Sequence, residues 1–523
     1  MDLTVADWLV STRAEPWLAR AALEDDPSSL AAAERWRRWL DPDRAAAVLD
    51  QIALRRRARA KLGAWAEALF LTREGLEMAT RAEVAQWRAA RLAAAGIERV
   101  VDGGTGLGID ATACVRAGLT VRGYERDPVL ARLAQANLDW AARARGDRAR
   151  AGRPAGIGGR DPDARDLGGP GAVGQCATDN ASAGQSAAEH GFVGRGDGDH
   201  DSTGQGRDDQ DRGDPAGAWP RVDCREIVDW PALATPGDTA TAWFLDPSRR
   251  TAAGPTWDPE RLAPPWPVVA DLLARADQPV VVKLGPGMPR GLIPPGLAAV
   301  WVSHNGELVE LSLWSGWSGW PPGRSAVLLP GGHSLPGGGA PAADGRSEGG
   351  ATAAENRSED GAPAADGRSR GGAGAAEDRS GGGAPVADDR SRGGEDAVAP
   401  GPVGRFLWEP DPAVIRARAT AELARRLEAR PLARHIPYLS GDQDRLTPFA
   451  RRFVVLERLD YSDRAVRAWV RRQGVGVLEI KTRGLDLDPA RWRRRLGLKG
   501  PNRATVVCSP TVDGAAVLVV RRD

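Results

Sequence analysis

The chain has 523 residues and a formal net charge of +1, which excludes a single small domain and a polyelectrolyte. At roughly 100–200 residues per domain, its length predicts two to four domains. No apolar run reaches the roughly 18 residues of a membrane-spanning helix. The first residues lack the basic and then apolar pattern of a secretion signal. The chain is therefore not expected to contain membrane segments. Four widely spaced cysteines and five scattered histidines predict a cytoplasmic protein without a disulfide framework or a metal site.

Residues 1–96 are expected to form a helical N-terminal region. Ala, Leu, Arg and Glu dominate, and apolar residues recur at three- and four-residue steps, as at Val48, Leu49 and Ile52. Thr80 is followed three residues later by Glu83, which is the spacing of a capping box. We therefore expect Thr80 to cap a helix that ends at Gly96.

Residues 97–330 alternate between short apolar runs and helical patterns. This alternation predicts an α/β fold with parallel strands joined by crossover helices. Two later strands flank His304-Asn305-Gly306, a hairpin turn signal. We expect five parallel strands followed by an antiparallel terminal hairpin, which is a Rossmann-like sheet.

Two glycine-rich stretches interrupt these patterns. Residues 151–217 hold 17 glycines and residues 331–400 hold 18, with almost no large apolar side chains. Such segments bury too little apolar surface to offset the entropy of ordering. We therefore expect a disordered insertion at about 143–217 and a disordered linker at 331–400. In the linker, the dipeptide Arg-Ser recurs five times at an 11-residue period.

Residues 401–523 are expected to form a small α+β domain. It begins with a short entry segment and a helix at 406–429, followed by strand, helix, strand, helix and a final strand pair. Its charge differs from that of the rest of the chain. It contains 25 basic and 14 acidic residues, a net charge of +11, so the rest of the chain is about −10. Arginine supplies 67 of the 71 basic residues of the whole chain. That bias leaves two interpretations of an Arg-rich run open: a surface that binds nucleic acid, or an ordinary solvated face.

The strongest motif follows the first expected strand and opens a helix. It has the pattern Asp-x-Gly-x-Gly-x-Gly, in which glycines allow a tight turn and a close approach to a ligand. Its residues are Asp102, Gly104, Gly106 and Gly108. The dinucleotide pattern G-x-G-x-x-G would need a glycine at Ile109, which weakens that alternative.

An acidic residue is expected next to this loop at the end of the second strand. A carboxylate there can accept hydrogen bonds from both hydroxyls of a ribose. Glu125 ends the apolar run and is favoured, while Asp127 either shares this role or caps the following helix.

A second motif, Asp246-Pro247-Ser248-Arg249, ends a later strand. A turn after a buried strand would explain Asp246 and Pro247 equally well. Lys283 ends the neighbouring strand, where it could pair with Asp246 or with a phosphate. Residues 70–80 either fold over a bound cofactor or simply mark the ends of helices.

These residues resemble the class I S-adenosylmethionine-dependent methyltransferases. The resemblance implies S-adenosylmethionine as cofactor, held at its methionine end by the three glycines and at its ribose by Glu125. It also implies an adenine contact from Glu226, with Asp223 as the competing assignment. Asp246 and Pro247 resemble the Asp-Pro-Pro-aromatic motif of amino-group methyltransferases and would be the catalytic pair. Here Ser248 and Arg249 replace the second proline and the aromatic residue.

The whole chain resembles a bacterial methyltransferase family with a C-terminal THUMP-like domain, a domain type associated with structured RNA. The resemblance implies a transferase that methylates tRNA or rRNA, with basic residues of the tail on the phosphates. These residues are Lys481, Arg483, Arg491, Arg493, Arg494, Arg495, Lys499 and Arg503. Two other function classes stay open: an RNA-binding scaffold without catalysis, and a small-molecule methyltransferase. The oligomeric state is not predicted.

Overall fold

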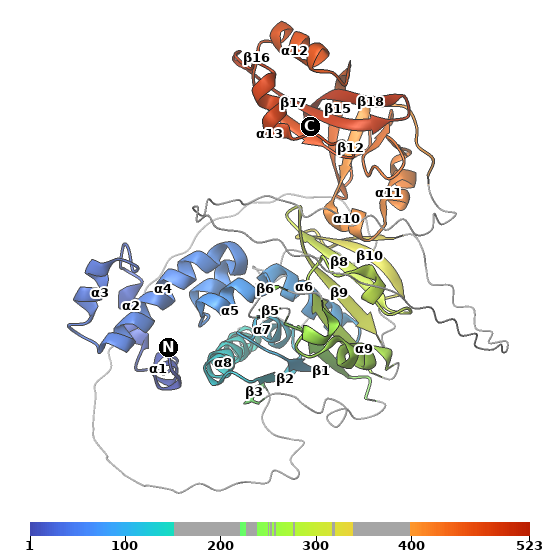
Figure 1. The fold of residues 1–523 in the computed structure, drawn as a ribbon. Helices are drawn as coiled ribbons and strands as arrows, with labels where there is room; N and C mark the ends of the chain where they lie inside the picture. The colour runs from blue at the N-terminus through green and yellow to red at the C-terminus, as the bar shows by residue number, and fades with distance from the viewer. Residues whose placement is uncertain are drawn as a thin grey trace, which may run out of the picture.

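The fold is described from a computed structural model of the chain. It describes residues 1–150, 220–225, 238–248, 250–251, 254–255, 258–275, 278–315, 320–337 and 398–522. Figure 1 shows a helical N-terminal part, a large central sheet and a second sheet at the C-terminal end. Both insertions expected from glycine content fall largely outside the described residues. Their described margins are ordered: helix α8 runs to Arg150, and strand β11 occupies His333–Pro336.

The N-terminal region is helical, as its periodicity predicts. The helices are α1 (Leu3–Leu9), α2 (Glu15–Ala21), α3 (Leu30–Trp36), α4 (Pro42–Leu62), α5 (Arg73–Met78) and α6 (Ala82–Ala94). The first four form their own apolar core, in which Trp36, Val48 and Ile52 are buried. Helices α5 and α6 instead share a core with the central sheet, so this region is continuous with the sheet.

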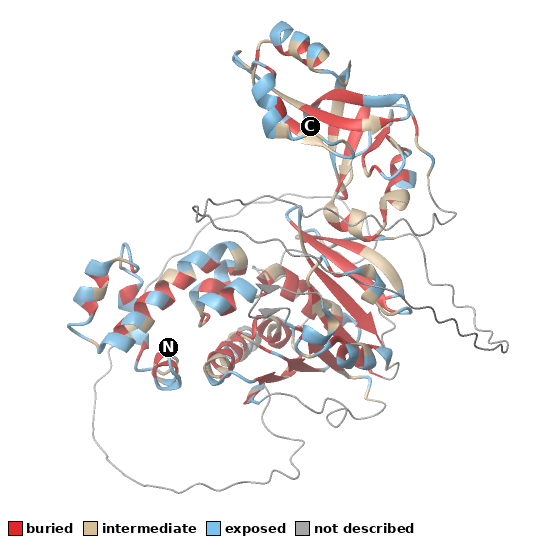
Figure 2. Cartoon of the chain, in the orientation of Figure 1, coloured by how far each residue is buried: buried red, intermediate tan, exposed pale blue. Residues whose placement is uncertain are grey.

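The central sheet has nine strands in the order β11-β10-β8-β9-β7-β4-β1-β2-β3. Five strands are parallel neighbours, as expected: β3 (Arg221–Cys224), β2 (Thr120–Glu125), β1 (Arg99–Gly103), β4 (Thr241–Leu245) and β7 (Val280–Leu284). Helices α7 (Ile109–Arg116), α8 (Pro128–Arg150) and α9 (Trp266–Ala274) cover its faces. The central strands β1, β4 and β7 are almost entirely buried, as the red strands of the sheet in Figure 2 show, whereas the edge strand β3 is largely exposed. Parallel strands covered on both faces are buried throughout, which explains their continuous apolar runs.

The expected terminal hairpin is present, but the sheet continues beyond it. Strands β8 (Ala298–His304) and β9 (Glu307–Ser315) pair antiparallel around Asn305, and β9 lies against β7. Strand β10 (Gly323–Leu329) then adds parallel to β8, and β11 pairs antiparallel with β10. This extension was not predicted, and β11 lies where glycine content predicted a linker.

The C-terminal region forms a seven-stranded sheet in the order β13-β14-β12-β15-β18-β17-β16. Its strands are β12 (Phe406–Pro410), β13 (Arg430–Pro431), β14 (Leu439–Gly441), β15 (Ala450–Asp460), β16 (Val475–Thr482), β17 (Asn502–Thr511) and β18 (Gly514–Arg522). Helices α12 (Asp463–Arg472) and α13 (Pro489–Arg495) share an apolar core with the last strands. From β15 to β18, the strands and the two helices occur in the expected order.

The start of this region differs from expectation. Residues 406–429 were expected to contain one helix, but they form β12 and two short helices, α10 (Pro412–Arg416) and α11 (Thr420–Leu427). Asp411 caps α10 through the backbone N–H of Ala413 at 2.8 Å. The backbone of Arg418 then has a φ of 56°. A non-glycine residue in that conformation ends the first helix before the second begins.

The two sheets share one apolar core. Trp408 and Leu423 of the C-terminal region belong to the same buried cluster as Trp301 and Leu328 of the central sheet. Figure 1 shows α10 and α11 between the two sheets. The C-terminal sheet is therefore attached through buried contacts of its first elements.

Candidate functional site

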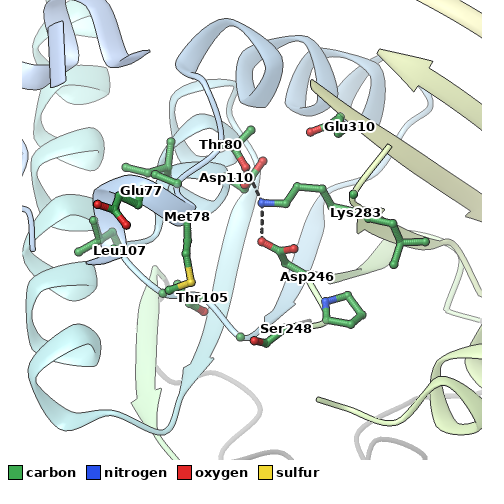
Figure 3. A pocket seen from close by; sticks show the side chains of 18 of the residues that line it. Glu77, Met78, Thr80, Thr105, Leu107, Asp110, Asp246, Ser248, Lys283 and Glu310 are labelled. Carbon is green, nitrogen blue, oxygen red and sulfur yellow. Dashed lines mark hydrogen bonds and ion pairs between the residues drawn. The ribbon is translucent and has the colours of Figure 1, made fainter. Parts of the chain in front are cut away.

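A cavity of about 910 Å³ opens at the carboxyl ends of the parallel strands. This is the edge at which ligands of open α/β sheets bind. Its walls come from the glycine loop after β1, from the ends of β2, β4 and β7, and from residues 75–81 between α5 and α6. Figure 3 shows side chains from the glycine loop, from β4 and β7 and from residues 77–80 around one space. The cavity therefore joins both motifs found in the sequence with part of the N-terminal region.

Two of the three motif glycines face open space. Gly104 and Gly106 have φ angles of 87° and 58°, and a Cβ atom added at either would meet nothing within 4 Å. Gly108 differs, because its added Cβ would approach a side-chain carbon of Leu138 in α8 at 3.0 Å. Gly108 is the N-cap of α7 and is not among the residues that line the cavity. The absence of a side chain at Gly108 therefore allows α7 to pack on α8, and a contact of this glycine with a cofactor stays a prediction.

Glu125 points back to the glycine loop. Its Oε2 accepts a hydrogen bond from the N–H of Gly106 at 2.8 Å, and its Oε1 accepts one from the N–H of Asp127 at 2.9 Å. Asp127 caps α8 by accepting from Val129 and Leu130. The structure thus separates two roles that the sequence left open: Glu125 belongs to the loop, and Asp127 starts the helix, although both line the cavity.

Of the two residues that were expected to contact an adenine, the structure describes only one. Glu226 lies outside the described residues. Asp223, the competing assignment, is bound by Arg122 at 2.8 Å and by Arg221 at 2.7 Å, and it is not part of the cavity wall. Its carboxylate therefore joins β2 to β3. Arg225, two residues further on, does line the cavity.

Asp246 forms an ion pair with Lys283, the partner that the sequence offered for it. Asp246 follows β4 and Lys283 lies in β7, which are adjacent strands. Only 12% of the Lys283 side chain is exposed, against 35% for Asp246. The ammonium group therefore lies inward and the carboxylate borders the cavity (Figure 3). Pro247 and Ser248 also line it, and the backbone of Ser248 pairs with Ala263 across the opening.

Thr80 does not have the expected capping role. The N-cap of α6 is Arg81, which makes no side-chain cap. The hydroxyl of Thr80 instead donates to Asp110 Oδ2 at 2.5 Å and accepts from Lys283 Nζ at 2.9 Å. Residues 70–80, for which the sequence left cofactor covering and helix punctuation open, therefore reach the cavity with their last members.

A buried arginine completes this network and was missed by sequence reasoning. Arg88 of α6 is 2% exposed and forms ion pairs with Asp110 and Glu310. Burial lowers the pKa of Arg88, but the two carboxylates outweigh burial and raise it. Arg88 lies in an ordinary amphipathic helix pattern, so its sequence carried no signal. Glu310 was equally hidden, as one of two acids in the largely apolar strand β9.

Asp102 lies beneath the glycine loop. It is 2% exposed, and its Oδ1 has no hydrogen-bond partner in the described part of the chain. Burial raises the pKa of Asp102 well above its ordinary value, and the nearby carboxylates of Asp110 and Asp246 add to this rise. Asp102 does not line the cavity. It therefore supports the loop from below.

The basic C-terminal residues that were expected to contact phosphates fall into two groups. Lys481, Arg493 and Arg495 bind protein atoms: Glu409 at 2.8 Å, the carbonyl of Leu478 at 3.0 Å and Asp463 at 3.5 Å. Arg483 lies within hydrogen-bonding reach of the Tyr438 hydroxyl. The other group consists of exposed residues that form no ion pair within the described residues: Arg491, Arg494, Lys499 and Arg503. Lys481 is only 18% exposed, so it is a poor phosphate ligand.

Within the described residues, none of the helices combines the length and the apolar character that a membrane span requires. No group of three or more His, Cys, Asp or Glu side chains there could hold a metal ion. Cys114, Cys224 and Cys508 are free thiols.

Known proteins match the C-terminal domain of this chain, and its relatives include S-adenosylmethionine-dependent methyltransferases. Residues 450–522 match the THUMP domain-like family. An uncharacterized S-adenosylmethionine-dependent methyltransferase of Mycobacterium tuberculosis, found in two strains, is 40% identical over 106 residues. That stretch covers 20% of this chain and 29% of the relative, so the chain matches less than a third of the length of these curated relatives.

A solved structure matches over the full length of the chain. The crystal structure of a candidate methyltransferase from Porphyromonas gingivalis W83 matches with a TM-score of 0.56 at 17% identity, over 100% of this chain and 98% of that chain. At this identity, the likeness is one of fold. The chain therefore combines a methyltransferase fold with a C-terminal THUMP-like domain, as the resemblance of its sequence implied.

Proposed function

We propose that the chain is a cytoplasmic S-adenosylmethionine-dependent methyltransferase that acts on RNA. The observation that carries this proposal is the cavity, in which an open glycine loop and the Asp246–Lys283 pair face the same space. The relatives named as S-adenosylmethionine-dependent methyltransferases support the choice of cofactor. The THUMP-like domain supports the choice of RNA.

The residues around the loop fit this cofactor. Gly104 and Gly106 leave room for a close ligand, and the Glu125 carboxylate at the loop suits the hydroxyls of a ribose. Seven acidic and five basic side chains line the cavity. At its inner end, the carboxylates of Asp110, Asp246 and Glu310 face the cations of Lys283 and the buried Arg88. This excess of negative charge favours a positively charged ligand.

When bound, S-adenosylmethionine supplies a methyl group on a cationic sulfur that a nucleophile can displace. The chain's own contribution is mostly placement of the acceptor, because such transfers depend on alignment of the reacting atoms. Asp246 is the residue that would hold an acceptor N–H, and Pro247 would fix the backbone beside it. Asp246 could also take up the proton that the acceptor nitrogen loses on methylation.

The exposed cations of the C-terminal domain would bind the RNA backbone. Arg491 and Arg494 lie on the outer surface of α13, and Lys499 and Arg503 follow in the next loop and strand. Because contacts with phosphates release counterions, this binding should weaken steeply with salt. This dependence separates RNA docking from a small-molecule substrate.

The decisive experiment incubates the full-length protein with methyl-labelled S-adenosylmethionine and total RNA. Label is expected in RNA with the wild type and is expected to be absent with Asp246→Ala. Binding of S-adenosylmethionine by both proteins, measured by calorimetry, shows that the loss concerns the acceptor. Label in small molecules, or cofactor binding without any transfer to RNA, would contradict the proposal and favour the alternatives considered from the sequence.

A further inference from the structure

Lys283 is the charged residue that connects the acceptor site to the rest of the molecule. Its ammonium group contacts Asp246 Oδ2 on one side and Thr80 Oγ1, at 2.9 Å, on the other. Thr80 donates to Asp110, which in turn binds Arg88. Figure 3 shows Lys283 reaching from β7 to both partners, which come from β4 and from the N-terminal region. One side chain thus bridges three segments that are far apart in sequence.

The Asp246 carboxylate uses only one oxygen in this network. Oδ2 binds Lys283, whereas Oδ1 has no partner among the residues described. With 35% of its side chain exposed at the cavity wall, Asp246 keeps this oxygen available to a ligand. Lys283 is buried more deeply, so it can orient the carboxylate without blocking its access to the cavity.

Charged groups face Asp246 from every element packed around it. Lys283 of β7 and Arg88 of α6 favour its ionised form, whereas Asp102 of β1 and Asp110 of α7 oppose it; Glu310 of β9 faces Lys283. Burial raises the pKa of Asp246, and Lys283 is the largest influence that lowers it. Arg88 is already engaged by two carboxylates, so removal of Lys283 would leave Asp246 in a negative surrounding.

We propose that Lys283 is a positioning residue of this site, which keeps the Asp246 carboxylate ionised and turned to the cavity while Thr80 holds the Lys283 ammonium in place. This inference rests on the proposed function for its purpose, because the ionised carboxylate can accept a hydrogen bond from the amine to be methylated at Oδ1 while Oδ2 stays paired with Lys283. Its physical content concerns the chain alone. The segment before α6 is thereby part of the acceptor site.

Infrared spectroscopy of the full-length protein tests the protonation of Asp246 without any substrate. At pH 7, Lys283→Met is expected to show an additional protonated-carboxyl band relative to the wild type. The band should persist in Lys283→Met/Asp102→Asn and disappear in Lys283→Met/Asp246→Asn, which assigns it to Asp246. Lys283→Arg keeps a positive charge and should lack the band. Absence of the band in Lys283→Met overturns the proposal, as does its persistence in the double variant with Asp246→Asn.

A second variant covers the case in which Lys283→Met does not fold. Lys283→Gln keeps an amide N–H for Asp246 and Thr80 but removes the charge, and the same band is expected at pH 7. Thr80→Val removes the hydroxyl that holds the ammonium but keeps the charge of Lys283, so a weaker protonated-carboxyl band than in Lys283→Met is expected. A band as strong as in Lys283→Met would contradict the assignment of the main role to Lys283, and no band would contradict the role of Thr80.

Kinetics with labelled RNA add a readout that a merely structural role would not move. For Lys283→Met, kcat at pH 7 should fall at least 30-fold and recover as pH rises, while KM for the cofactor changes less than threefold. Lys283→Arg should restore the wild-type pH profile. A pH-independent loss would overturn the proposal. If the wild type binds no S-adenosylmethionine, the proposed function fails, whereas the infrared result still decides the role of Lys283.

Discussion

The two sheets of this protein use charged residues in opposite ways. Around the cavity of the central sheet, the charges are buried and joined across elements: Arg88 is 2% exposed, and Lys283 is 12% exposed. In the C-terminal region, cations such as Arg491 and Arg494 lie on the surface of α13, and the paired Arg458 and Arg472 also stay exposed, whereas Lys481 is an exception at 18% exposure. A buried charge left without its partner is costly, whereas an exposed pair contributes little. Single substitutions should therefore have large effects at the cavity and small, additive effects on the C-terminal surface.

The largest effect is expected at Asp246. Asp246→Asn removes the charge that would hold an acceptor amine, and loss of one such preorganised group typically costs on the order of 100-fold or more in rate. Methyl transfer to RNA at pH 7 is the measurement. The matched control is Asp271→Asn on α9, where the carboxylate is 72% exposed and paired with Arg275. Equal activity of the two variants would remove Asp246 from the site.

A substitution in the glycine loop tests the open side of the cavity. Gly106→Ala places a methyl group in space that is empty within 4 Å, and it strains a backbone with a φ of 58°. Gly96→Ala, after α6, has the same strain, with a φ of 81°, and equally empty surroundings outside the cavity. Each should lose about 1 kcal/mol of stability. Only Gly106→Ala should weaken cofactor binding, by tenfold or more in calorimetry; equal affinities would show that the loop does not approach the ligand.

On the C-terminal surface, the double variant Arg491→Ala/Arg494→Ala should weaken RNA binding moderately. If each arginine neutralises one phosphate, the slope of log affinity against log salt should fall by about 0.7–0.9 per residue. Arg458→Ala/Arg472→Ala removes the same charge from residues that already pair with Asp513 and Glu457. A salt titration that finds equal slopes for both double variants would favour a solvated face without RNA contacts.

The smallest effect concerns the pH dependence of stability. The pKa of Asp102 is raised well above its ordinary value, first by burial, so the folded state holds this proton at pH values where the unfolded chain has lost it. Stability of the wild type should therefore fall as pH rises above about 4, by at most about 1.4 kcal/mol per pH unit from this group. Asp102→Asn should lack this contribution. Unfolding midpoints of both proteins from pH 4 to 8 provide the test; parallel curves would contradict it.

The sequence predicted those features that depend on local pattern. The parallel strands, the β8–β9 hairpin and the glycine loop before α7 were all readable, because their turns need glycine or Asn-Gly and their strands need apolar runs. The pairing of Asp246 with Lys283 was also within reach, since both end neighbouring strands. Strands β10 and β11 were not predicted. The glycine content from residue 331 onward indicated a linker where β11 lies.

The roles of Thr80, Arg88 and Gly108 were decided only by the tertiary structure. Thr80 had the spacing of a cap, and Gly108 the spacing of a ligand contact, yet their neighbours in space are Lys283 and Leu138. These partners lie 30 to 203 residues away in the chain. Local sequence determines the backbone conformation of a segment, whereas the energy of a buried charge depends on what long-range packing places beside it.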